Sequence, residues 1–156
     1  MLTDDVLDYI DRSVLCWLAT VDARGTPNVS PKEVFCAHGR DRVLIANIAS
    51  PTSVRNLRTN PRVCVSFVDV FVQKGYKLVG DAEVILPGDP RFPLLEAPLA
   101  AITRGLFPIR GVIAVRVTAA EPIVAPSYRP IPGTTEESQV AAAMRTYRVV
   151  PASRDR

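Results

Sequence analysis

The sequence predicts a mainly β fold, an antiparallel barrel of six or seven strands with short α-helices at its ends. Several short runs are rich in valine, isoleucine and leucine, as expected for strands. Turn-forming segments at 22–27 and 38–41 separate the first runs closely. A chain of 156 residues with 47% hydrophobic and 22% charged residues suits one domain with its own core. Closure into a barrel would leave few exposed strand edges.

The first part of the chain predicts one helix followed by three strands. Apolar spacing favours an amphipathic helix over 3–13, which Thr3 or Asp4 can cap. The strands are expected over 14–21, 28–37 and 42–48. Because only tight turns separate them, they are expected to form an antiparallel meander.

The second part predicts a short helix, three more strands and a helical C-terminus. Ser50 suits the N-cap of a helix over 50–59, and Pro51 suits its first turn. The later strands are expected over 62–70, 76–86 and 111–120, with partly helical segments at 89–104 and 136–148. We therefore predict a barrel domain over 1–126 and a C-terminal extension over 127–156 that packs on the barrel or on a partner chain.

Composition argues against several classes of protein. The net charge of +3 is spread along the chain, which indicates a solvated surface rather than a nucleic-acid site. No apolar stretch approaches the roughly 20 residues that span a bilayer, so no membrane contact is expected. The three cysteines are far apart and there is one histidine, so no metal site is predicted. Reduced cysteines and a cytoplasmic location are expected.

Hydroxyl groups gather at the predicted start of the helix over 50–59. Ser50, Thr52 and Ser53 lie there, with Arg55 one turn further along. Free N–H groups and the helix dipole favour an anion such as a phosphate at this position, and Lys32 is a candidate second cation. The alternative is an ordinary capped helix with a solvent-exposed arginine.

Residues 30–33, Ser-Pro-Lys-Glu, form the second candidate segment. A proline within a strand removes a ladder donor, which marks an edge, a bulge or a place where a ligand replaces a strand neighbour. Lys32 and Glu33 should point to opposite faces. One of them should therefore face a ligand or a partner chain, whereas the alternative is a pair of edge charges that discourage aggregation.

The order of these segments resembles the FMN-binding split barrels of the pyridoxamine 5′-phosphate oxidase-like family. The resemblance covers about residues 10–86, and its most specific pieces are TVDARGTPNVSPKEVF (20–35), NLRTNPRV (56–63) and LVGDAEV (78–84). It implies a homodimer with FMN in a groove at the subunit interface. The isoalloxazine ring would lie along the second and third strands, with its phosphate near the helix over 50–59.

Residue types and resemblance together give a predicted FMN-binding set. Backbone groups of the second strand are expected at the pyrimidine edge of the ring, and Asn47 offers both a donor and an acceptor. Lys77 falls where resembling proteins often carry a basic residue near the phosphate. The predicted cofactor-binding residues are Ser30, Pro31, Lys32, Val34, Asn47, Ile48, Ala49, Ser50, Ser53, Arg55 and Lys77.

The predicted function is that of an FMN-dependent oxidoreductase acting on a small molecule, with an electron donor such as NAD(P)H. No catalytic side chain is predicted, because one histidine allows no Ser-His-Asp arrangement. The Arg-x-His element of true pyridoxamine phosphate oxidases is absent at 144–148, so another substrate is expected. Alternatives are a non-catalytic flavin-binding or sensor protein, or a split barrel that uses the deazaflavin F420. Haem is disfavoured, since only His38 offers an imidazole.

Overall fold

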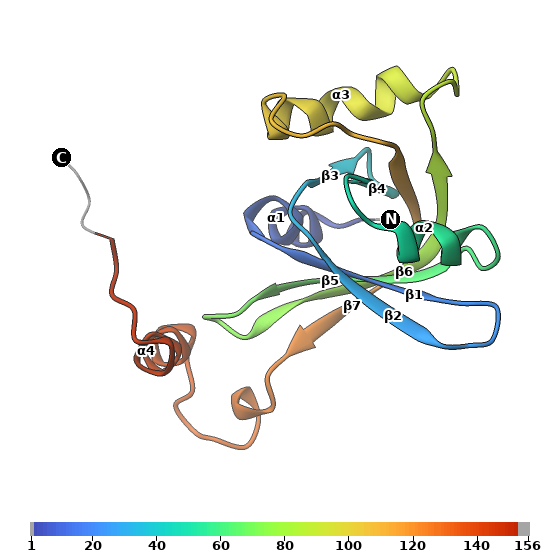
Figure 1. The fold of residues 1–156 in the computed structure, drawn as a ribbon. Coiled ribbons are helices and arrows are strands. Elements are labelled where there is room, and N and C mark those ends of the chain that lie inside the picture. Colours follow the sequence, from blue (N-terminus) through green and yellow to red (C-terminus); the bar gives the residue numbers. More distant parts are fainter. Residues whose placement is uncertain (1, 153–156) are drawn as a thin grey trace.

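The computed structural model describes residues 2–152 and shows a curled seven-stranded antiparallel sheet with short helices (Figure 1). This arrangement confirms the predicted split barrel. In chain order the elements are α1 (Asp4–Arg12), β1 (Cys16–Val21), β2 (Pro27–Lys32), β3 (Phe35–His38), β4 (Arg42–Ala46), α2 (Pro51–Leu57), β5 (Arg62–Asp69), β6 (Lys74–Ile85), α3 (Phe92–Thr103), β7 (Val112–Val124), a 3-10 turn (Pro126–Tyr128) and α4 (Glu136–Tyr147).

The strand order β2-β1-β5-β6-β7-β4-β3 places β2 and β3 at opposite edges of the sheet. Only Glu33 and Val34, which form a bend, connect these two strands. The predicted single strand over 28–37 is therefore wrong. The antiparallel pairings predicted for its two neighbours are found, but β2 pairs with β1 and β3 pairs with β4 at opposite edges, so the predicted meander is divided. The alternation of polar and apolar residues stops at Lys32 and Glu33, and Pro31 indicates an edge or a bulge. Neither signal shows that the chain crosses from one edge of the sheet to the other at this point. The structure thus has a seam where its two edges meet.

Two apolar clusters hold the helices on the sheet. Helix α1 inserts Val6 and Ile10 among the inward-facing side chains of β1, β5 and β6, and all of these are buried. Helix α3 covers β4 and β7 with Leu95 and Leu99. Fully burying such an aliphatic side chain contributes about 1.5–3 kcal/mol, so these clusters dominate the stability of the fold.

A small polar network fixes α2 against β1 and β2. The buried Thr20 accepts hydrogen bonds at Oγ1 from the side-chain amides of Asn28 and Asn56, each at 3.1 Å. The Asn28 amide also donates to Ser53 Oγ at 3.4 Å. The start of α2 is therefore positioned by contacts that the hydrophobic pattern does not encode.

Replacing Thr20 with valine should lower the free energy of unfolding by about 1–3 kcal/mol. The change keeps the shape of the side chain but leaves two amide groups with no acceptor at Oγ1, and an unpaired buried donor costs about that much. Urea denaturation of the wild type, Thr20→Val and Thr20→Ser measures the effect. Thr20→Ser keeps the acceptor, so a Thr20→Val protein as stable as Thr20→Ser would contradict this role.

The C-terminal segment is held on the β5–β6 hairpin. Tyr128 donates its hydroxyl to the Val72 carbonyl at 2.8 Å, and Lys74 pairs with Glu136 at 2.7 Å. The division into a barrel and an extension over 127–156 stays a prediction, and the last four residues of that extension lie outside the described part of the chain. No helix within residues 2–152 is long and apolar enough to cross a membrane.

Candidate functional site

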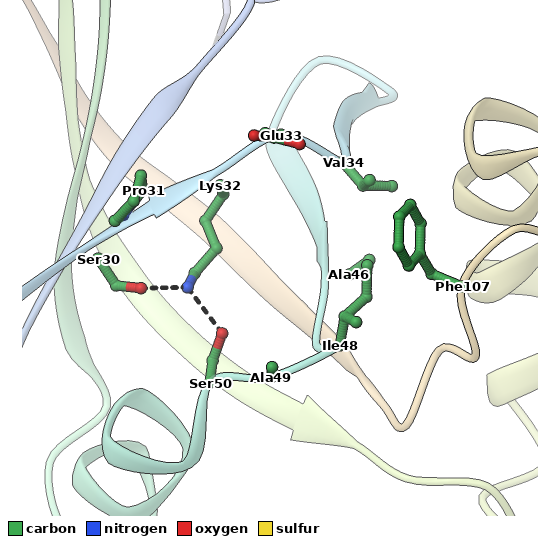
Figure 2. Close-up of a pocket in the computed structure, with 10 residues that line it drawn as sticks. All are labelled: Ser30, Pro31, Lys32, Glu33, Val34, Ala46, Ile48, Ala49, Ser50 and Phe107. Atoms are coloured by element: carbon green, nitrogen blue, oxygen red, sulfur yellow. Dashed lines mark hydrogen bonds between the residues drawn. The ribbon is translucent and has the colours of Figure 1, made fainter.

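A cavity of about 400 Å³ lies at the seam between the two edges of the sheet (Figure 2). It is bounded by the end of β2, the bend after it, the end of β4 with the segment that leads to α2, and the loop between α3 and β7. Its lining residues are Ser30, Pro31, Lys32, Glu33, Val34, Ala46, Ile48, Ala49, Ser50 and Phe107. The volume falls within the range of small-molecule sites.

Lys32 is the buried charge of this cavity. The alternation of β2 turns its side chain inward, where it is 6% exposed. Its ammonium donates hydrogen bonds to Ser30 Oγ and, at 2.7 Å, to Ser50 Oγ, as Figure 2 shows. No carboxylate among the described residues forms an ion pair with it. A buried ammonium with neutral partners only is a site for an anionic or electron-rich ligand atom.

The surroundings of Lys32 supply no hidden negative charge. Burial lowers the pKa of its ammonium. Cys16 is its register partner on β1, and burial raises the pKa of that thiol to about 12. The thiol is therefore neutral at physiological pH and does not balance the lysine. Within the described residues the ammonium of Lys32 contacts hydroxyl groups only, which leaves its charge available to an anionic ligand atom.

The opposite side of the cavity is apolar. Val34, Ala46 and Ile48 form its wall, and Phe107 reaches it from the loop between α3 and β7. Figure 2 shows the Phe107 ring beside Val34, across the cavity from Lys32. The ring is 53% exposed, so it has apolar surface left to contact a ligand. The cavity thus has a cationic end and an apolar end.

The structure brings together most of the residues predicted to bind a cofactor. Those that line the cavity are Ser30, Pro31, Lys32, Val34, Ile48, Ala49 and Ser50. Ser50 occupies the N-cap position of α2, as the sequence predicted, but its side chain caps no helix N–H and contacts Lys32 instead. Whether these residues bind a cofactor stays a prediction.

Four predicted residues lie elsewhere. Asn47 accepts the Ser50 N–H at Oδ1 and exchanges backbone hydrogen bonds with 110–111, so it shapes the strand end. Ser53 belongs to the polar network that fixes α2 against β1 and β2. Arg55 is exposed on α2, and Lys77 pairs with Glu121 at 2.9 Å. None of the four lines the cavity, and their predicted role in binding remains untested.

Three lining residues were missing from the prediction. Glu33 was interpreted as an edge charge, and its exposed side chain lies at the rim of the cavity. Ala46 ends a buried strand, and its position in the sequence carries no sign of a site. Phe107 lies far along the chain in a loop of irregular pattern, so only the closure of the barrel shows that it faces Lys32.

The described residues hold no group suited to a metal. No cluster of three or more His, Cys, Asp or Glu side chains within residues 2–152 could hold an ion. His38 ends β3 and does not line the cavity. The chemistry of the site is therefore that of one buried ammonium, hydroxyl groups, a rim carboxylate and apolar walls.

The family model described as pyridoxamine 5′-phosphate oxidase matches residues 2–122. The chain belongs to the pyridoxamine 5′-phosphate oxidase family. The match includes every residue that lines the cavity, and it ends two residues before β7 does. A comparison with curated proteins gives no match.

Solved structures of similar fold carry different names. HupZ from Group A Streptococcus is 26% identical, with a TM-score of 0.66, and the match covers 77% of this chain and 92% of that one. An FMN-binding protein from Syntrophomonas wolfei has a TM-score of 0.67 at 16% identity, with 78% and 86% covered. The haem storage protein HutZ from Vibrio cholerae has a TM-score of 0.59 at 22% identity, with 80% and 95% covered. The last two identities establish a shared fold only.

Proposed function

We propose that this chain binds FMN in the seam cavity and acts, as a homodimer, as an oxidoreductase on a small molecule. The observation that carries the proposal is the buried ammonium of Lys32, which forms no ion pair within residues 2–152 and faces an apolar wall across the cavity. Membership of the pyridoxamine 5′-phosphate oxidase family supports the choice of a flavin.

The groups that line the cavity fit an isoalloxazine ring. This ring is planar, with carbonyl groups along its pyrimidine edge and two methyl groups on its opposite benzene edge. Lys32 offers a charged donor for the carbonyl edge. Strand β2 is an edge strand paired only with β1, so its other side presents backbone N–H and C=O groups to a ligand. Val34 and Ile48 offer apolar contact to the ring.

The same residues fit haem and F420 less well. Haem iron needs an axial ligand, and the single histidine of the chain, His38, is not at the cavity. F420 carries an acidic tail that favours a broad basic groove, whereas Lys32 is the one basic residue in the lining. The donor set therefore favours FMN, whose phosphate we place near Ser50 and the start of α2.

Bound FMN would supply the electron transfer, and the chain would supply position and charge. Lys32 would hold negative charge at the pyrimidine edge, and the apolar wall would keep water from the ring. The lining offers no histidine or cysteine as a general acid or base. A small-molecule substrate, reduced at the open face with electrons from a donor such as NAD(P)H, is consistent with this set.

The outer face of β1 and β2 supports the homodimer. Trp17 and Val29 point outward and are 45% and 58% exposed, and both lie on this apolar face. Pro31, which pairs with Trp17 in register, also lines the cavity. A second copy covering this face would bury apolar surface and reach the cavity rim, in agreement with a shared ligand groove.

The absorbance spectrum and the mass of the ligand that co-purifies test the proposal. Flavin absorption bands and the mass of FMN are expected, and the bands should bleach when NAD(P)H is added without oxygen. Binding of FMN without bleaching would leave the non-catalytic flavin protein as the function. A protein that rejects FMN but takes up F420 or haem would overturn the proposal.

A further inference from the structure

The loop that carries Phe107 is fixed at both of its ends. Arg104 and Gly105 have positive φ angles of 50° and 73° and turn the chain after α3. At the other end, the Arg110 N–H donates to the Asn47 carbonyl at 2.9 Å, which ties the loop to the end of β4. The backbone therefore presents Phe107 at the cavity from a defined position.

Phe107 and Lys32 form opposite ends of one cavity (Figure 2). The aromatic ring is half exposed beside Val34 and Ile48, whereas the ammonium lies among hydroxyl groups. A planar ligand with one polar and one apolar edge can match both ends in only one direction. In the reverse direction its carbonyl groups would lose their water against an apolar wall, and its methyl groups would contact a charge.

We infer that Phe107 is a specificity-determining residue that contacts the methyl-bearing edge of the flavin ring while Lys32 binds the carbonyl edge. This inference rests on the proposed function. The loop that carries Phe107 would then select the orientation of the flavin ring and the substituents on its benzene edge. Aromatic contacts of this kind favour planar apolar partners beyond simple burial.

A double-mutant cycle, in which one change is made in the protein and the other in the ligand, tests this contact. FMN and its analogue lacking both ring methyl groups are titrated into the wild type, Phe107→Ala and Leu106→Ala, with binding followed by flavin fluorescence. Phe107→Ala should weaken FMN binding by roughly fivefold to tenfold. Loss of the methyl groups should weaken binding to the wild type by several fold more than to Phe107→Ala. Leu106 is 75% exposed on the same loop and does not line the cavity, so Leu106→Ala should bind like the wild type.

The outcomes separate this inference from the function on which it rests. If the effects of Phe107→Ala and of methyl removal on binding are independent, Phe107 does not contact that edge, and the inference is wrong while the FMN proposal stands. If the wild type binds neither flavin, both are overturned. Thermal unfolding of the free proteins checks that Phe107→Ala remains folded, and Phe107→Leu, which keeps an apolar side chain, should recover part of the lost affinity.

Discussion

Replacing Lys32 with methionine is expected to weaken FMN binding by roughly 10- to 150-fold. A hydrogen bond to a charged group contributes about 1.5–3 kcal/mol, which corresponds to that range. Methionine is an unbranched apolar side chain that replaces most of the lysine stem, and it removes a buried charge that forms no ion pair within residues 2–152. The free energy of unfolding of the free protein should therefore stay the same or increase.

Lys74→Met is the matched control for this experiment. Lys74 is paired with Glu136 on the surface and does not line the cavity. Isothermal titration with FMN should show wild-type affinity for Lys74→Met and a large loss for Lys32→Met. Equal affinities for all three proteins would remove Lys32 from the binding site and with it the main support for the proposed function.

The lowered pKa of Lys32 has opposite consequences for binding and for stability. Burial lowers this pKa from the ordinary value of 10.5. FMN binding needs the ammonium, so affinity should fall as pH rises through the lowered pKa. The folded free protein holds this proton less tightly than the unfolded chain does, so its stability should rise with pH between the lowered pKa and 10.5.

FMN titration and urea denaturation over an alkaline pH series check both directions. The wild type should lose affinity while the free protein gains stability over the same interval. Lys32→Met lacks the titrating group, so neither dependence on Lys32 should remain. An unchanged pH dependence of binding in Lys32→Met would assign the effect to another group.

The sequence predicted the cationic end of the cavity because local signals mark it. Pro31 within a strand indicated an edge, a bulge or a place where a ligand replaces a strand neighbour, and Ser50 before Pro51 indicated the start of a helix. Both signals lie in segments whose order along the chain is typical of the family. They brought Lys32 and Ser50 into one predicted site, and the structure places their side chains in contact.

The remaining parts of the site depend on packing that the sequence does not display. Arg55 was expected at the site because it follows Ser50 by about one turn. Ser53, Asn56 and Leu57 take the buried face of α2, so the helical period directs Arg55 to solvent. Phe107 carries no local signal at all, since its position at the cavity depends on the course of the loop after α3.

Trp17→Glu is expected to convert a dimer of the wild type into a monomer. In a two-fold symmetric interface each substitution occurs twice, so two carboxylates would be buried at the interface. An uncompensated buried charge costs about 3–5 kcal/mol, and the dissociation constant should rise by at least about 100-fold. Sedimentation velocity at several protein concentrations measures the change.

Leu94→Glu provides the matched control, because Leu94 is 72% exposed on α3, which lies on another side of the barrel from β1 and β2 (Figure 1). It should remain dimeric. Because Pro31 belongs both to the outer face and to the cavity lining, the monomeric Trp17→Glu protein should also bind FMN more weakly than Leu94→Glu. A wild type that sediments as a monomer at every concentration would refute the dimer. A monomeric Trp17→Glu protein with full affinity would show instead that one chain completes the FMN site, so that covering the apolar face and binding the flavin are separate properties of the fold.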